Sequence, residues 1–197
     1  MFVIAGPNGA GKSTFYRNVI APRIKAPFIN ADIIQHDELK NPSMQAAYQA
    51  ATIAEARRQR ALRTGTSFVT ESTFSHASKL ALVHGAKATG FCVAVYHINV
   101  RQPELSVARV AQRVSEGGHG VPEGKIRERY ERNQPLIRMA VLAADFAFVY
   151  DNSWLNRPAE LLITFRNGEV IDSADGLPAW AQTLYAGELV TAAARQV

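Results

Sequence analysis

The chain has 197 residues, and because 47% of them are apolar it is not expected to be disordered throughout. Its length suits one domain, and no linker-like stretch divides it, so we expect a single domain over 1–197. The formal net charge of +5 fits an anionic nucleotide as well as nucleic acid.

Several classes of protein are disfavoured by simple features. Cys92 is the single cysteine, so no intramolecular disulfide can form, and its place in the apolar run Cys92–Val100 favours a thiol in the core. No run of 18 apolar residues is present, so no membrane span is expected. No basic region precedes the apolar N-terminal stretch, which argues against a signal peptide and for a cytoplasmic protein. Nucleic acid is not expected as a partner, because charges of both signs mix in Arg101–Arg138 without a pattern of interleaved aromatic residues.

Apolar runs bounded by turn residues predict alternating strands and helices. Strands are expected at Phe2–Ala5, Phe28–Asp32, Ser67–Glu71, Cys92–Val100 and Phe146–Tyr150, and a hairpin at Leu161–Phe165 and Glu169–Asp172 around Asn167-Gly168. Helices are expected at Lys12–Ile24, Met44–Arg63, Ser75–Lys87 and Pro103–Ser115, from Pro122 along the seam Ile126, Tyr130, Ile137 and Val141, and at Leu177–Arg195. The alternation indicates an α/β fold with a mostly parallel sheet of about five strands, covered on both faces.

The turn after the first strand carries a phosphate-binding motif. It reads Gly6-Pro7-Asn8-Gly9-Ala10-Gly11-Lys12-Ser13 and matches G-x-x-x-x-G-K-[ST] at every fixed position. The glycines let the backbone approach phosphate oxygens, and successive N–H groups converge on the anion at the start of the next helix. Lys12 is expected to act near the β and γ phosphates of ATP and Ser13 to ligate Mg²⁺, with Thr14 completing the nucleotide-binding set.

Two acidic residues are the last residues of predicted strands, at the edge where parallel sheets bind ligands. We expect Asp32 to be the general base that accepts the proton of an acceptor hydroxyl, although a helix N-cap is the alternative. Glu71 is either a substrate-side acid or a first-turn acid beside a helix. The fourth strand ends in His97-Ile98-Asn99-Val100 without an acid, so Mg²⁺ would rely on Ser13, phosphates, water and an acid from elsewhere.

A basic segment follows the fourth strand and is broken by glycines. Arginines here can stabilise the charge that builds up in phosphoryl transfer, with a solvated basic face as the alternative. We expect Arg113 to contact ATP and to act in catalysis, and Arg129 to lie on the substrate side. His119, between two glycines, is either a phosphate contact or an exposed loop residue. The segment 113–125 would form a hinged lid.

Taken in order, these motifs resemble the zeta toxin family of P-loop kinases, in particular its chromosomal zeta-like branch. The resemblance rests on Gly6–Thr14, Asn30-Ala31-Asp32, Thr70-Glu71-Ser72-Thr73, the run Arg113–Glu123 and Asp151-Asn152-Ser153.

The resemblance implies a P-loop kinase-like three-layer sandwich with ATP and Mg²⁺ as cofactors. It also implies phosphorylation of a UDP-activated amino sugar at its 3′-hydroxyl, with Asp32 activating that hydroxyl and Glu71 and Thr73 lining the substrate side. A protein antitoxin is a partner implied by the family alone. Two other functions stay open: a kinase of another small alcohol or of a polynucleotide 5′-hydroxyl, and a nucleotide-dependent switch ATPase. A switch ATPase of the ABC type would need a signature motif and a strand-borne Walker-B acid, neither of which we find.

Overall fold

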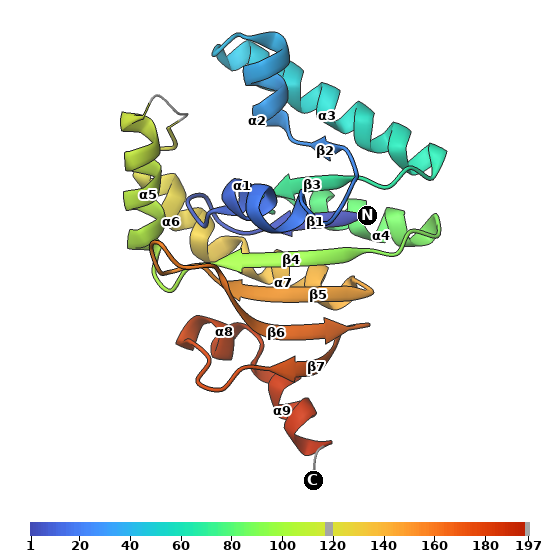
Figure 1. The fold of residues 1–197 in the computed structure, drawn as a ribbon, viewed down its shortest axis with the longest axis vertical. Coiled ribbons are helices and arrows are strands. Elements are labelled where there is room, and N and C mark those ends of the chain that lie inside the picture. The colour runs from blue at the N-terminus through green and yellow to red at the C-terminus, as the bar shows by residue number, and fades with distance from the viewer. Residues whose placement is uncertain (117–119, 196–197) are drawn as a thin grey trace.

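One sheet runs through the computed structural model, which describes residues 1–116 and 120–195 (Figure 1). Its seven strands lie in the order β2-β3-β1-β4-β5-β6-β7. Their bounds are β1 Phe2–Ala5, β2 Phe28–Ile29, β3 Val69–Ser72, β4 Ala94–Asn99, β5 Phe146–Asp151, β6 Glu160–Arg166 and β7 Glu169–Ser173. The first five strands are parallel, and the hairpin β6–β7 extends the sheet antiparallel beyond β5, so it belongs to the central sheet.

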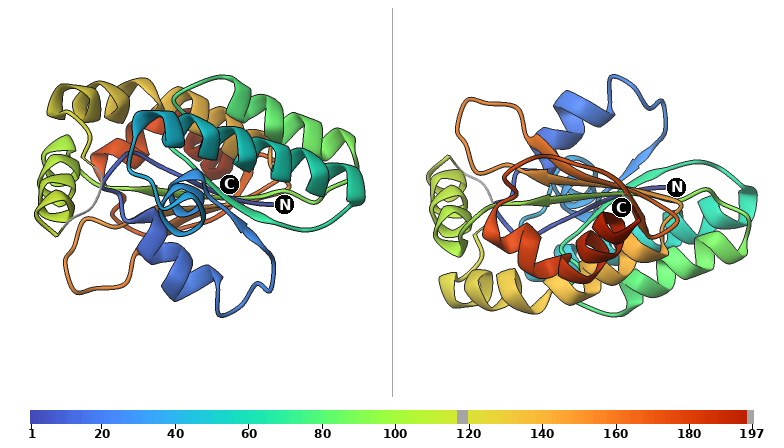
Figure 2. Two further views of the ribbon diagram at one scale, coloured as in Figure 1. Left: turned by 90° about the horizontal axis from the view of Figure 1, so that it is seen from above. Right: turned by 90° about the horizontal axis from the view of Figure 1, so that it is seen from below.

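Helices cover both faces of this sheet (Figure 2). Their bounds are α1 Lys12–Phe15, the π-helix η1 Tyr16–Ile20, α2 Ala31–Ile33, the π-helix η2 Ile34–Leu39, α3 Met44–Thr64, α4 Ser78–Ala88, α5 Pro103–Ser115, α6 Glu123–Arg132, α7 Gln134–Ala143, α8 Ala179–Leu184 and α9 Ala186–Ala194. Apolar side chains of α3, α4, α7 and α8 form the larger core with one face of the sheet. Phe15 of α1 and Ile20 of η1 pack on the other face, against Ile4 and Ile98. The predicted three layers are confirmed.

The parallel strands bring the loops of interest to one edge. β1 lies between β3 and β4, with Ala5 in register with Ser72 on one side and His97 on the other. The segments that follow β1, β3 and β4 therefore leave the sheet at the same carboxyl edge. Helices α5 and α6 lie beyond this edge (Figure 1).

Local sequence signals account for several helix bounds. α3 begins after Ser43, whose hydroxyl accepts a hydrogen bond from the Ala46 N–H at 3.2 Å, and it ends at Gly65, which is left-handed at φ 66°. α5 has the predicted bounds Pro103–Ser115, with proline in its first turn.

Three predicted elements end earlier or divide. The first helix stops at Ile20, and β2 stops at Ile29. The long helix predicted from Pro122 breaks at Asn133, which separates α6 from α7, although its four seam residues are all buried. The break has a cause in the sequence, because Pro135 lacks an N–H and cannot donate the helical hydrogen bond to the carbonyl four residues earlier, that of Glu131.

Two further expectations need correction. The closing helix is divided into α8 and α9 at Tyr185, which is fully buried. Cys92 is exposed, so the expectation of a core thiol is wrong. β4 begins only at Ala94, which leaves Cys92 in the loop before the strand. No helix within the described ranges is long and apolar enough to cross a bilayer.

Candidate active site

The phosphate loop, residues 6–13, leads from β1 into the first turn of α1 in a conformation that its glycines make possible. Gly9 and Gly11 are left-handed, at φ 75° and 88°. A Cβ on Gly9 would lie 2.4 Å from the Ser106 carbonyl oxygen, and one on Gly11 would lie 2.3 Å from the amide nitrogen of Asn152. The loop is therefore packed against α5 and the β5–β6 segment as well as bent, and only glycine fits both demands.

Lys12 points back over this loop and is almost fully buried. Its Nζ donates a hydrogen bond to the Pro7 carbonyl oxygen at 3.0 Å and lies 3.6 Å from a Glu71 carboxylate oxygen. Burial lowers the Lys12 pKa, while the nearby Glu71 and Asp32 carboxylates act to raise it and the Arg113 charge acts to lower it. The buried ammonium therefore depends on nearby negative charge, which the phosphates of a nucleotide would also supply.

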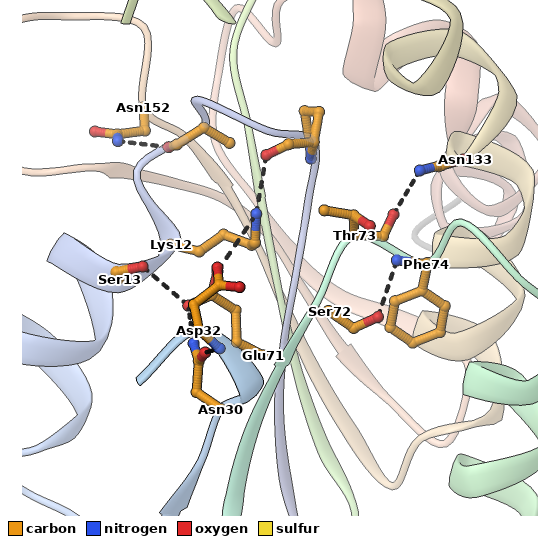
Figure 3. A network of polar contacts seen from close by, with 12 residues as sticks. Lys12, Ser13, Asn30, Asp32, Glu71, Ser72, Thr73, Phe74, Asn133 and Asn152 are labelled. Carbon is orange, nitrogen blue, oxygen red and sulfur yellow. Dashed lines mark hydrogen bonds and ion pairs between the residues drawn. The ribbon is translucent and has the colours of Figure 1, made fainter. Parts of the chain in front are cut away.

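Glu71 joins the phosphate loop to the neighbouring strand (Figure 3). Besides the Lys12 contact, its carboxylate accepts hydrogen bonds from the Ser13 hydroxyl at 3.0 Å and from the Asn30 amide at 3.2 Å. Glu71 is therefore the carboxylate beside Ser13 that was expected from outside the fourth strand, and it lies on β3 rather than β4. Hydroxyl and carboxylate oxygens suit Mg²⁺, and the phosphates of ATP would complete its coordination. No group of three or more His, Cys, Asp or Glu side chains suited to a metal occurs within the described residues.

Asp32 lies near this network but not where the pattern predicted. β2 ends at Ile29, so the expectation that Asp32 closes the strand is wrong. It occupies the first turn of α2, with its side chain exposed. The N-cap is Asn30, whose side-chain oxygen accepts from the Asp32 N–H at 2.8 Å and the Ile33 N–H at 3.4 Å. The cap alternative for Asp32 is therefore also wrong, and its carboxylate is not engaged in capping.

The remaining residues of the loop motif have structural contacts of their own. Ala10 is fully buried, and its carbonyl oxygen accepts a hydrogen bond from the Asn152 amide at 2.8 Å. Thr14 is exposed, with its hydroxyl 3.5 Å from an Arg17 nitrogen. Asn8 and Gly6 complete the turn, and their contacts with phosphate remain predictions.

The two arginines that were predicted for the site, Arg113 and Arg129, differ in their surroundings. Arg113 is exposed in the last turn of α5, near enough to Lys12 to act on its pKa. Arg129 of α6 is partly buried, and among the described residues its side chain makes no hydrogen bond or ion pair. Its neighbours are engaged, since Arg127 pairs with Glu104 and Glu123, and Arg132 pairs with Glu128. His119 and the glycines before it lie outside the described residues, so the lid of 113–125 stays a prediction.

Thr73 follows β3 directly, next to the Glu71 network. Its side chain is partly buried, and its carbonyl oxygen accepts a hydrogen bond from the Asn133 amide at 2.7 Å. The structure therefore places Lys12, Ser13, Asp32, Glu71 and Thr73 together at one edge of the sheet (Figure 3).

A polar cluster around Asp151, Asn152 and Ser153 supports the phosphate loop and had no predicted role in the site. The Asp151 carboxylate is buried, accepts from Arg101 Nε at 2.8 Å and also binds Ser153. Arg109 donates to the Asn152 carbonyl oxygen at 2.8 Å. The available signal in the sequence was the run of three polar residues, Asp151, Asn152 and Ser153, at the end of a buried strand. The sequence did not reveal that Asn152 contacts the phosphate loop, more than 140 positions away.

Comparisons with known proteins agree with this fold. The model of the AAA_33 family, described as an AAA domain, matches residues 1–136. An uncharacterised protein of Haemophilus influenzae is 30% identical over 125 residues, which cover 64% of this chain and 88% of that protein.

Solved structures with low sequence identity share the architecture. The AvrRxo1-ORF1:-ORF2 complex with ATP matches with a TM-score of 0.66 and 17% identity over 95% of this chain, which spans 62% of the length of that chain. The PezAT chromosomal toxin–antitoxin system of Streptococcus pneumoniae matches with a TM-score of 0.63 and 17% identity, over 98% of this chain and 83% of that chain. These likenesses show a P-loop kinase-like fold.

Proposed function

The chain belongs to the AAA_33 family, described as an AAA domain, and from that premise we propose that it is an ATP-dependent phosphotransferase that acts on a hydroxyl group of a small metabolite. The observation that carries the proposal is the network around Glu71. One carboxylate contacts Lys12 and Ser13 of the phosphate loop, while Asp32 lies on the adjoining helix. A nucleotide site and a carboxylate for an acceptor hydroxyl thus share one edge of the sheet.

The chemistry follows from the properties of these side chains. ATP supplies the γ-phosphoryl group, whose bond to the β-phosphate oxygen breaks as a bond to the acceptor oxygen forms. Lys12 stabilises negative charge on the transferred group, and Asp32 accepts the proton that the acceptor hydroxyl loses. Ser13 and Glu71 are the residues that would hold Mg²⁺, which neutralises phosphate charge when bound. Arg113, near enough to act on Lys12, adds positive charge on the same side.

For the acceptor, we propose a UDP-activated amino sugar phosphorylated at its 3′-hydroxyl. The ordered motifs that resemble zeta toxins support this choice, and the structural likeness to the PezAT system is compatible with it. We extend the proposal to a protein antitoxin as partner and to a cytoplasmic location, where ATP and nucleotide sugars are available.

The test is transfer of labelled γ-phosphate from ATP into a panel of UDP-sugars, small alcohols and 5′-hydroxyl oligonucleotides. We expect label in a UDP-amino sugar, and Lys12→Ala should reduce transfer below about 1% of wild type, as expected when a group that stabilises transition-state charge is removed. Exposed Lys25 offers the matched control Lys25→Ala, which should transfer at the wild-type rate. Label in oligonucleotide alone would replace the acceptor by a polynucleotide end. ATP hydrolysis without transfer to any acceptor would refute the phosphotransferase and favour a switch ATPase.

A further inference from the structure

The segment after β3 is a turn under backbone strain. Phe74 is left-handed at φ 53°, a conformation that a bulky side chain rarely adopts. Such a conformation persists only where its surroundings hold it. Phe74 is buried in the larger core, and its N–H donates a hydrogen bond to the Ser72 hydroxyl at 3.0 Å. The burial of Phe74 in the core and its hydrogen bond to Ser72 therefore hold the turn in place at the end of β3.

A second contact that fixes the turn comes from Asn133, 60 positions after Thr73 in the chain. Asn133, between α6 and α7, is 1% exposed, and its amide donates to the Thr73 carbonyl oxygen at 2.7 Å (Figure 3). Its own N–H remains bonded to the Arg129 carbonyl oxygen at 3.2 Å. The side chain makes no cap hydrogen bond at the start of α7 and instead reaches across to the turn.

Asn133 also stands where α6 joins the body of the domain. One turn earlier, the buried Tyr130 hydroxyl donates to the Val100 carbonyl oxygen at 2.5 Å, just beyond β4. Near the middle of α6, Arg127 ties the helix to α5, because its guanidinium lies 2.5 Å from a Glu104 carboxylate oxygen. The helix pair α5–α6 is therefore anchored to the turn after β3 through Asn133 and to the end of β4 through Tyr130.

We propose that Asn133 is a positioning residue for the acceptor, which holds Thr73 in place and links it to the root of the α5–α6 pair. This inference rests on the proposed function. ATP binding should be insensitive to Asn133, because Glu71 and Asn152 hold the phosphate loop from other elements. The acceptor side should be sensitive, because the resemblance to zeta toxins assigns Thr73 to the substrate side, and a small misplacement of a group that contacts substrate costs catalytic efficiency steeply.

The experiment compares three single variants by steady-state kinetics, with the UDP-amino sugar that is labelled in the transfer panel as the acceptor. Asn133→Ala and Ser72→Ala each remove one hold on the turn, and each should lower kcat/KM for the acceptor about tenfold, while KM for ATP changes less than about twofold. Tyr130→Phe is the matched control, since it removes a buried hydrogen bond from the same helix root without touching Thr73. It should leave acceptor kinetics unchanged. Hydrogen exchange at the amide of Phe74 should increase in the first two variants only.

The outcomes separate the inference from the proposed function. A wild type that phosphorylates no acceptor would overturn both. An active wild type whose acceptor kinetics match those of Asn133→Ala would overturn the inference alone, as would an equal acceptor defect in Tyr130→Phe, which would indicate general loosening of α6. If Asn133→Ala does not fold, Asn133→Asp decides, because it keeps the size of the side chain and removes the amide donor to Thr73; normal acceptor kinetics in that variant would refute the inference.

Discussion

Replacing Glu71 with glutamine tests the compensation of charge at the centre of the site. The substitution keeps the size of the side chain and removes its negative charge, 3.6 Å from Lys12 Nζ, where the two side chains are 14% and 6% exposed. At an effective dielectric constant of about 20, unit charges at this distance attract by about 4 to 5 kcal/mol. Loss of one partner from a buried ion pair costs about 3 to 5 kcal/mol. Because burial already lowers the Lys12 pKa, we expect the nucleotide-free protein to lose about 3 kcal/mol of unfolding free energy.

Thermal unfolding without nucleotide measures this loss. For a domain of this size, about 3 kcal/mol corresponds to a fall in Tm of about 6 to 12 °C. Glu38→Gln is the matched control: Glu38 pairs with Arg57 through two hydrogen bonds of 2.6 Å, but both side chains are nearly half exposed, so we expect no measurable change. Equal Tm values for wild type and Glu71→Gln would refute the claim that Glu71 compensates the Lys12 charge.

Three further predictions concern catalysis and pH. Asp32→Asn should lower kcat for transfer about 10²-fold or more with ATP affinity retained, and near-normal kcat would remove Asp32 as the base. Arg129→Ala should weaken acceptor phosphorylation while Arg132→Ala, whose guanidinium already pairs with Glu128, should not; equal effects in a rate assay would contradict a specific role for Arg129. Burial lowers the His97 pKa to about 3 from its ordinary 6.5, so between these values the unfolded chain binds a proton that the folded chain excludes. The contribution of His97 to the unfolding free energy is therefore complete above pH 6.5 and is lost on acidification, by about 1.4 kcal/mol per pH unit. Denaturant titrations at pH 7 and pH 5 should show a smaller loss of unfolding free energy for His97→Gln than for the wild type.

The sequence by itself was sufficient for features that depend on neighbouring residues. The phosphate loop was readable because its glycines and the start of the next helix lie within eight positions. The hairpin turn was readable for the same reason: Asn167 and Gly168 adopt the left-handed angles, φ 51° and 78°, that a primed turn requires. The bounds of α5 follow from its proline start and its apolar spacing. These signals act within one or two turns of chain.

Tertiary structure decided what depends on strand order and on long-range contact. Pairing of β3 beside β1 brings Glu71 to Ser13 across 58 positions, and the pattern around Glu71 does not reveal which strand will be its neighbour. At the break between α6 and α7, the Asn133 amide donates to the Thr73 carbonyl oxygen 60 positions away, a contact that depends on how these helices pack against the sheet. Asp32 lies in a helix rather than in the predicted strand because Asn30, two residues earlier, caps that helix. A short strand and a capped turn compete for this segment, and the capped turn forms. Local sequence signals indicate which elements form, whereas the contacts that assemble the site form only when distant elements share one sheet.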